Sequence, residues 1–414
     1  MDRRAVSVLP TFAWIAALCV ALVVTACASL GRLSSVPPSE TPKAQPLGIA
    51  NARFFPFQQR DEVIAEGARA LERQRKTLGL APDAPLPPVH FLAISGGGDD
   101  GAFGSGVLVG WTEAGDRPQF DIVTGVSTGS LIAPFAFLGP AYDPQLREVY
   151  TTISPDDVYV SRGILGGIFS DALSDTTPLS NTISRFFDVA MMQAIAREYE
   201  KGRLLLIGTT NLDAELPVIW NIGAIAASGH PDALELIRKI LRASSAIPGF
   251  FQPVMIDVTL DGKPYQELHV DGGAIAQIFL YPSNVALDRF GAREREAFLI
   301  RNAREDASWA NVQRRTLSVG VRAISAMLRA SGANDLTRIY FVTQRDGVDY
   351  NLAYIGSDFT VPHPTANFDR VYMNALFDYG YQQARRGYPW RKSPPLLMGL
   401  EDEPVTARLS GSGP

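Results

Sequence analysis

The sequence predicts an α/β fold with a central mixed, mostly parallel sheet. Two observations carry this prediction. From His90 onward, short apolar runs alternate with longer segments of helical periodicity, and glycine-rich turns follow the first two apolar runs. Strands that alternate with helices imply a sheet covered by helices on both faces. The chain has 414 residues, of which 46% are hydrophobic, so it can bury a large core.

The individual elements follow from apolar runs and their periodicity. Residues 61–78 are predicted as an amphipathic helix, because apolar residues recur there at helical spacing between charges, and prolines between residues 82 and 88 end it. We predict strands at residues 91–94, 120–124, 204–207, 218–221, 254–258, 267–270, 297–300 and 339–342. We predict further helices at residues 102–113, 127–138, 232–241, 309–328 and 370–386.

The N-terminal residues are typical of an export signal. Arg3 and Arg4 precede an apolar stretch that ends before Cys27 and falls short of the about 20 residues that span a bilayer. The sequence Val-Thr-Ala-Cys at its end resembles a bacterial lipobox, so we expect Cys27 to be lipidated and Cys19 to be removed with the signal. Without a second thiol, no disulfide is expected.

The expected organisation of the chain follows from these signals and from composition. A Ser- and Pro-rich stretch after Cys27 is typical of an extended tether. The predicted parts are a signal peptide (1–26), a lipidated cysteine with a flexible tether (27–50), an N-terminal helical segment (51–87), a catalytic domain (88–400) and a disordered tail (401–414). The net charge of −5 argues against nucleic acid as a partner, because phosphate binding needs a basic face.

The first motif is the run Gly-Gly-Gly-Asp-Asp-Gly at residues 96–101, between a predicted strand and a predicted helix. Such a turn presents bare N–H groups at a helix N-terminus, where negative charge is favoured. The N–H groups of Gly96, Gly97 and Gly98 could stabilise the oxyanion of an acyl transfer. The same run also fits the G-x-G-x-x-G dinucleotide fingerprint, so this motif alone leaves both interpretations open.

The second motif favours acyl transfer. Gly125-Val-Ser127-Thr-Gly129 lies between a predicted strand and an apolar helix, which is the context of a nucleophile elbow. Small flanking residues let the chain bend sharply, so that a serine hydroxyl projects from the edge of the sheet. We therefore predict Ser127 as the nucleophile; the alternative is a serine that only caps the helix.

A serine nucleophile needs a base, and the sequence offers two candidates. Asp271 leaves a predicted strand just before Gly272 and Gly273, and desolvation would raise its basicity. His363 follows it in the chain, so that Ser127, Asp271 and His363 have the order of an α/β-hydrolase triad. We expect His269, on the same strand as Asp271, to be a partly buried neighbour of the site.

The motifs together resemble the patatin-like phospholipase family. Gly-Gly-Gly-x-x-Gly, Gly-x-Ser-x-Gly and Asp-Gly-Gly occur in the family's order, and residues 243–254, 209–213, 300–303 and 376–381 are similar to other segments of it. The resemblance implies a three-layer α/β/α fold, a Ser127–Asp271 dyad without a catalytic histidine, an oxyanion hole at Gly96–Gly98 and lipid acyl hydrolase activity. The family usually has Arg or Lys where this chain has Asp100, which bears on substrate choice and rate.

The sequence thus predicts a serine hydrolase of lipid acyl esters, with phospholipid as the expected substrate. We expect no cofactor and no metal, although Asp99 and Asp100 are conceivable ligands. Ile247, Phe250 and Phe251 could line an acyl-chain groove. Lipidated Cys27 would anchor the enzyme in a bacterial envelope, at the outer membrane facing the periplasm; the oligomeric state is not predicted. The alternatives are the triad esterase, a dinucleotide-dependent oxidoreductase and a non-catalytic envelope lipoprotein.

Overall fold

The computed structural model describes residues 31–161, 172, 174–305, 311–364 and 367–397. Its centre is a nine-stranded sheet in which a path of seven strands runs in the order β1-β7-β6-β3-β2-β10-β11, with β9 and β8 joined at one end of β6. The strands of this sheet are β1 (Arg53–Phe54), β2 (Val89–Ile94), β3 (Ile122–Val126), β6 (Leu204–Asn211), β7 (Leu216–Asn221), β8 (Val254–Leu260), β9 (Lys263–Asp271), β10 (Arg295–Arg304) and β11 (Asp349–Ile355). A small pair, β4 (Val160–Ser161) and β5 (Ser174–Asp175), forms a second sheet.

The sheet is mixed and mostly parallel, as the sequence predicts. The five strands from β6 to β11 pair in parallel, whereas β7, β1 and β9 are antiparallel to their neighbours. Parallel strands need crossover connections, and helices supply them here. The α-helices of the described chain are α2 (Arg60–Leu78), α3 (Gly101–Ala114), α4 (Thr128–Leu138), α5 (Asp143–Thr152), α7 (Thr177–Phe186), α8 (Val189–Glu200), α9 (Ile222–Ala226), α10 (Ala233–Ser244), α11 (Thr316–Arg345) and α12 (Arg370–Arg385).

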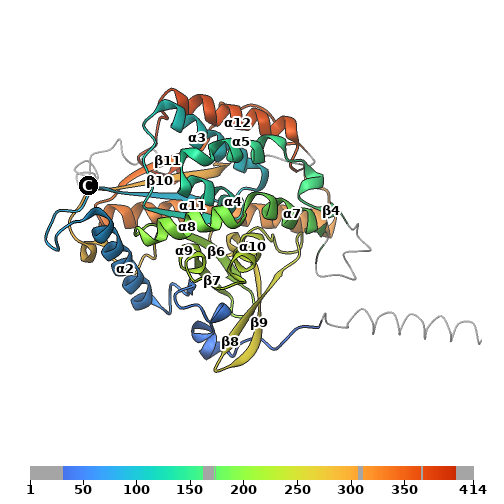
Figure 1. Cartoon of the computed structure of the whole chain (residues 1–414). Helices are drawn as coiled ribbons and strands as arrows, with labels where there is room; N and C mark the ends of the chain where they lie inside the picture. The colour runs from blue at the N-terminus through green and yellow to red at the C-terminus, as the bar shows by residue number, and fades with distance from the viewer. Residues whose placement is uncertain (1–30, 162–171, 173, 306–310, 365–366, 398–414) are drawn as a thin grey trace, which may run out of the picture.

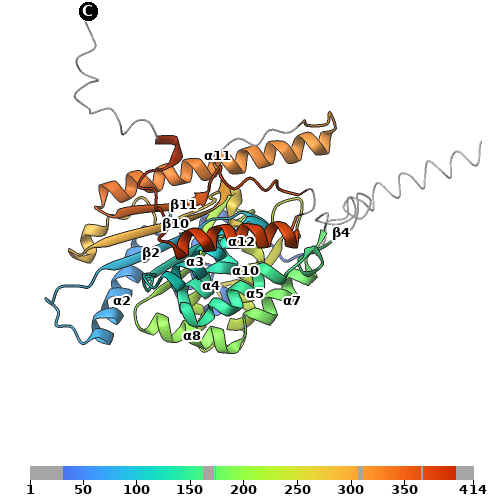
Figure 2. The same ribbon diagram turned by 90° about the horizontal axis from the view of Figure 1, so that it is seen from above.

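Two separate apolar cores show that helices cover both faces of the sheet (Figures 1 and 2). On β2, Leu92 and Ile94 pack into a large core with α3, α4, α10 and α12. The alternate residues of the same strand, Phe91 and Ala93, pack into a smaller core with Leu336 and Ile339 of α11. Alternate residues of a strand face opposite sides, so these two cores define three α/β/α layers and confirm the predicted fold class.

One predicted strand is wrong. Residues 339–342 belong to the C-terminal half of α11, and the strand on this side of the sheet is β11, which the sequence analysis missed. A short apolar run has no periodicity that separates a buried strand from the buried face of a helix. Ile339 is buried because that face packs against the sheet. Residues 309 and 310, the first two of the predicted helix at 309–328, lie outside the described residues.

Residues 31–50 differ from the extended tether that the sequence predicts. Arg32 forms an ion pair with Asp213, and Gln45 pairs with Thr259 of β8. Thr41 is buried, although its neighbours are polar and prolyl residues. This part of the chain lies along the β8–β9 hairpin (Figure 1). The predicted signal peptide, Cys27 and the C-terminal tail lie outside the described residues. Among the described residues, no helix is both long and apolar enough to cross a membrane.

Candidate active site

The sheet brings Ser127 and Asp271 together along one side of β6. On that side, β6 pairs first with β3, up to Val126 opposite Gly208. The next residue, Thr209, pairs with Asp271, the last residue of β9, which arrives from the opposite direction. The C-terminal ends of β3 and β9 therefore meet beside β6, at consecutive positions on the same side of this strand. Ser127 follows the last residue of β3 at the point where Asp271 ends β9.

Ser127 has the strained backbone of a nucleophile elbow. Its φ is 55° and its ψ is −128°, a conformation that non-glycine residues rarely adopt. The Ser127 N–H donates to Ser244 Oγ at 3.0 Å, and this hydroxyl donates in turn to the Gly208 carbonyl at 2.7 Å. A side chain at Gly129 would overlap the carbonyl oxygen of Ile94, so the turn tolerates only glycine there. The helix α4 begins at the next residue after the serine.

Asp271 has the environment of a carboxylate base. It is 5% exposed, and burial raises its pKa to about 7 from an ordinary value of 3.8. A hydrogen bond from the Ser127 side chain and one from the Gly273 N–H, at 2.7 Å, lower this pKa but do not cancel the effect of burial. Asp271 therefore has a high affinity for a proton near neutral pH, and the Ser127 side chain interacts with it.

In the glycine turn, two of the three N–H groups predicted as oxyanion donors have no acceptor within the described chain. The Gly96 N–H donates to the Gln277 carbonyl at 3.0 Å, so it is occupied and the prediction for Gly96 needs correction. The N–H groups of Gly97 and Gly98 donate to no acceptor in the part of the chain that the structure describes. A Cβ at Gly97 would overlap the carbonyl oxygen of Asn302, which explains the glycine there. Gly96 retains a different role, because it packs directly against the Ser127 side chain.

An apolar cavity of about 80 Å³ opens at Ser127. A water molecule needs about 10–15 Å³ of such space, so the cavity has room for a short length of acyl chain. Ile247 and Phe251 lie on its wall as predicted, whereas Phe250 is not among its lining residues. The wall is otherwise made mainly of apolar side chains from α4, α5, α7 and α8, namely Leu131, Pro134, Phe135, Val149, Ile153, Leu179, Ile183, Phe186, Phe187 and Met191.

His363 lies away from the dyad. Its Nε2 contacts Asp99 Oδ1 at 3.1 Å, and its Nδ1 contacts the Pro364 carbonyl at 2.8 Å. The hydrogen bond to Asp99 raises the pKa of His363 to about 9, so the ring is a cation with both nitrogens engaged. A cationic imidazole cannot accept the serine proton. The structure therefore contradicts the triad of Ser127, Asp271 and His363.

Asp100 is half-buried beside this ion pair. Burial raises its pKa to about 6, while a hydrogen bond from the Tyr372 hydroxyl, at 2.6 Å, lowers it. The residue that replaces the family's basic side chain thus points to a tyrosine of α12. Ligand atoms of Asp99, Asp100 and His363 lie within 4.8 Å of one another. The geometry suits a cation, but each of these side chains already has a partner within the protein.

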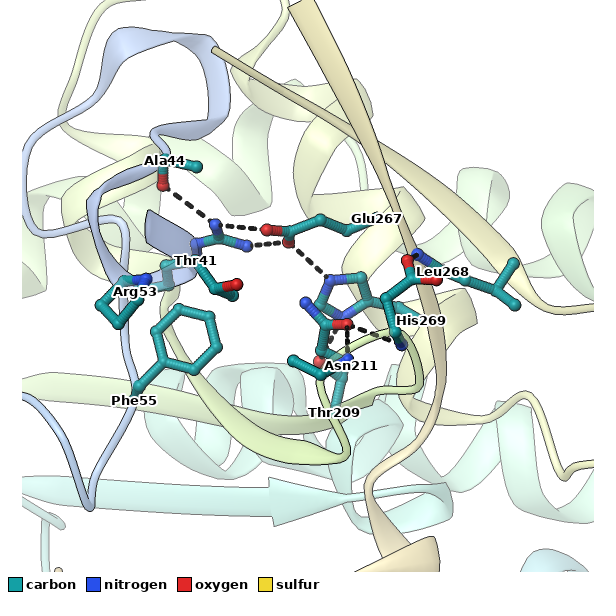
Figure 3. A network of polar contacts seen from close by, with 12 residues as sticks. Thr41, Ala44, Arg53, Phe55, Thr209, Asn211, Glu267, Leu268 and His269 are labelled. Carbon is teal, nitrogen blue, oxygen red and sulfur yellow. Dashed lines mark hydrogen bonds and ion pairs between the residues drawn. The ribbon is translucent and has the colours of Figure 1, made fainter. Parts of the chain in front are cut away.

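His269 belongs to a buried polar network and not to the edge of the site (Figure 3). Arg53 forms an ion pair with Glu267, which accepts a hydrogen bond from His269 Nε2 at 3.1 Å. The other ring nitrogen, Nδ1, lies 3.0 Å from the Thr209 hydroxyl. Burial lowers the pKa of His269, so the ring is neutral, with its proton on Nε2. The expected partial exposure of His269 is wrong, because the residue is 0% exposed.

The network holds β9 in register with β6. Thr209 is the residue that pairs with Asp271, and its hydroxyl also accepts a hydrogen bond from Trp220 Nε1 at 2.8 Å. Arg53 joins this group from the N-terminal segment, where it also donates to the Ala44 carbonyl at 2.9 Å. Sequence reasoning missed Arg53 and Glu267, because an isolated arginine far upstream carries no local signal of a buried ion pair.

A serine on a strained strand-to-helix turn beside a buried carboxylate is typical of serine hydrolases with an α/β fold. Comparison with known proteins narrows this class. Residues 92–282 match the family model described as patatin-like phospholipase. The chain therefore contains a patatin-like phospholipase domain over these residues, and this match supports a lipid acyl hydrolase, as the sequence predicts.

Among solved structures, the chain is similar to the crystal structure of VipD from Legionella pneumophila. The sequences are 14% identical, the TM-score is 0.35, and the alignment covers 74% of this chain and 68% of that one. The comparison with curated proteins finds no match.

Proposed function

We propose that the enzyme hydrolyses the carboxylic esters of phospholipids through a Ser127–Asp271 dyad. The observation that carries the proposal is the hydrogen bond between a serine in a strained elbow and a buried carboxylate, at the mouth of an apolar cavity. The raised pKa of Asp271 makes it a stronger base than an aspartate in water. No other titratable side chain is needed to activate the hydroxyl.

The first half of the reaction forms an acyl-enzyme. Ser127 Oγ attacks the ester carbonyl while Asp271 accepts its proton, and negative charge develops on the carbonyl oxygen. The N–H groups of Gly97 and Gly98 are the donors that would stabilise this oxyanion. The tetrahedral intermediate then collapses, and protonated Asp271 returns its proton to the departing alcohol.

The second half releases the fatty acid. Water attacks the acyl-Ser127 ester and gives a proton to Asp271, which then passes it to the serine as the acyl bond breaks. The acyl chain lies in the apolar cavity throughout, because its wall offers almost no polar group. Leu131 and Phe251 both lie on that wall. The head group remains outside, which fits a phospholipid better than a compact polar ester.

The test compares purified wild type with Ser127→Ala and Asp271→Asn on a panel of phospholipids and neutral esters, with released fatty acids measured by mass spectrometry. Both variants should release almost no fatty acid. Ser105→Ala is the matched control, because its hydroxyl only bonds back to the Gly101 carbonyl of its own helix. Equal release by wild type and Ser127→Ala would refute the mechanism.

Two further measurements separate this proposal from its alternatives. A fluorophosphonate probe should label wild type but not Ser127→Ala; a folded wild type that is not labelled would support a non-catalytic lipoprotein. His363→Gln should keep turnover within about tenfold of wild type, since His363 pairs with Asp99 and not with the dyad. A folded His363→Gln without turnover would revive the triad.

We further propose that Cys27 is lipidated and attaches the enzyme to the bacterial envelope, at the outer membrane. The lipobox in the sequence supports this proposal. Mass spectrometry of the protein from its membrane fraction should find the mature chain beginning at an acylated Cys27. Cys27→Ala should leave the signal peptide uncleaved and carry no lipid.

A further inference from the structure

The helix α11 is longer than the strand beside it. Its 30 residues extend about 45 Å, whereas the seven residues of β11 extend about 23 Å. Its buried residues begin at Gly332 and continue through Leu336 and Ile339, so only the C-terminal half packs on the sheet. Figure 2 shows the N-terminal half of α11 extending past the body of the protein. We call residues 318–330 the overhang.

The overhang lies at the same end of the sheet as the nucleophile, where the parallel strands have their carboxyl ends. The chain leaves β10 at Arg304, passes to the start of α11, and runs back to begin β11 at the other edge. The start of α11 is therefore near the carboxyl ends of the parallel strands. Ser127 follows the carboxyl end of β3 in the same sheet. A surface that contacted the overhang would face the edge that carries the dyad.

The outward face of the overhang is apolar. Val319, Ala323, Met327 and Ala330 follow one another at helical spacing on the side away from Gly332 and Leu336. Met327 is 70% exposed and Val319 is 52% exposed, although both are large apolar side chains. Nothing in the described chain covers this face, and a soluble body rarely leaves a row of such residues in water.

Arginines border the apolar face. Arg315, Arg322 and Arg329 recur every seven residues, which places them in one line along the helix, and Arg314 precedes them. No aspartate or glutamate occurs from residue 311 to residue 334, although the whole chain has a net charge of −5. An apolar face beside a line of arginines is the pattern of helices that lie in the interface of anionic membranes.

We propose that the overhang of α11 lies on an anionic phospholipid surface, with its apolar face among the acyl chains and its arginines at the phosphates. This contact would present the edge with Ser127 to the bilayer, and to that extent it rests on the proposed function. Association of two copies through the same face is disfavoured, because it would bring two lines of arginines together. Lipid phosphate instead offers the opposite charge.

The test places a probe on the overhang of the full chain. In a background of Ser127→Ala, Cys19→Ala and Cys27→Ala, Met327→Cys carries an environment-sensitive fluorophore, and vesicles contain brominated lipid as a quencher. We expect quenching at residue 327 in vesicles with phosphatidylglycerol and little at Leu78→Cys. Leu78 is 50% exposed at the end of α2, before the amino end of β2, and serves as the matched control site.

A pair of charge variants tests the role of the arginines. Each arginine near an anionic surface contributes about 1 kcal/mol, which corresponds to about fivefold in the docking equilibrium. At saturating lipid, the double variant Arg315→Gln, Arg329→Gln should shift the docking equilibrium about 25-fold toward the undocked overhang, and it should therefore reduce quenching at residue 327. Lys76→Gln with Arg386→Gln removes the same charge from exposed positions elsewhere and should change it less than twofold.

Three results would overturn the proposal: no quenching at residue 327 on vesicles that bind the chain, equal quenching at residues 327 and 78, or a dimer in sedimentation that Met327→Glu abolishes. Failure of the proposed function would look different. In the background with an intact Ser127, a soluble short-chain ester reports the dyad without any membrane. Arg315→Gln with Arg329→Gln should keep that turnover while losing turnover on anionic vesicles.

Discussion

The strand β9 carries two buried carboxylates on one face that behave in opposite ways. Glu267 and Asp271 are 1% and 5% exposed. Burial alone would raise both pKa values, and it raises that of Asp271 to about 7. For Glu267 the charge of Arg53, with hydrogen bonds from His269 and Arg53, outweighs burial and lowers the pKa to about 2. The two groups lie only four positions apart in the chain.

The difference shows that the partner, and not burial, decides what a buried carboxylate can do. Glu267 has a cation, so it is a permanent anion that holds the N-terminal segment and β9 together. Among the described residues, Asp271 has only a hydroxyl and an N–H as partners, so no cation pairs with its charge there and its affinity for a proton is high. One face of one strand thus provides both a structural ion pair and a candidate base.

The largest expected effect comes from removing the base. Asp271→Asn should lower kcat by about 10⁴-fold, because the amide cannot take the proton of Ser127. Turnover of a soluble ester, measured under saturation, checks this. Asp257→Asn on the exposed side of β8 is the control and should be unaffected. A residual rate within tenfold of wild type would mean that Asp271 is a second structural carboxylate.

The next effect concerns the structural carboxylate. Glu267→Gln should reduce the free energy of unfolding by about 3–5 kcal/mol, because it leaves the Arg53 charge buried and uncompensated. Urea unfolding at pH 7 measures this loss. Replacing both partners, with Arg53→Met and Glu267→Met, should recover most of it. If folded Glu267→Gln lost as much kcat as Asp271→Asn, the contrast between a structural and a catalytic carboxylate would be contradicted.

The pH dependence of turnover sharpens the comparison. The proposed base works only when ionised, so kcat/KM should approach a tenfold fall per pH unit below the Asp271 pKa of about 7, or about 50-fold from pH 7 to pH 5. Glu267 stays ionised over this range because its pKa is about 2. A flat profile between pH 5 and 7 for a soluble ester would contradict the assignment of Asp271.

A smaller effect with the opposite sign is expected for stability. The folded pKa of Asp271 lies about 3 units above the unfolded one, so ionisation opposes folding by about 4 kcal/mol above pH 7 and by nothing below about pH 4. Asp271→Asn removes this cost but weakens hydrogen bonds, for a net gain of about 2 kcal/mol. Thermal unfolding should therefore show the variant more stable than wild type at pH 8, and this advantage should be lost by about pH 4, where only the weakened hydrogen bonds remain.

Local sequence signals predicted the parts of the site that follow from one short segment. The elbow at Ser127 needs glycines on both sides of a strand-to-helix turn, and Asp271 ends a strand before two glycines, so both are visible in a few residues. The fold class followed from alternating periodicities in the same way. These features are local consequences of backbone geometry, and the structure places them where the sequence indicated.

What the sequence could not predict depends on distant segments. Arg53 pairs with Glu267 across 214 positions, and His363 meets Asp99 across 264. Which N–H of the glycine turn is occupied depends on Gln277, well outside the motif. The strand β11 was missed because the apolar run before it, at the end of α11, competed for the same assignment.

The contact of Arg53 with Glu267 also limits how the protein can be trimmed. Because Arg53 and the Ala44 carbonyl join the strand that ends in Asp271, residues 44–53 are part of the enzyme's framework. An expressed fragment that starts at α2 would lack the cation and expose β8.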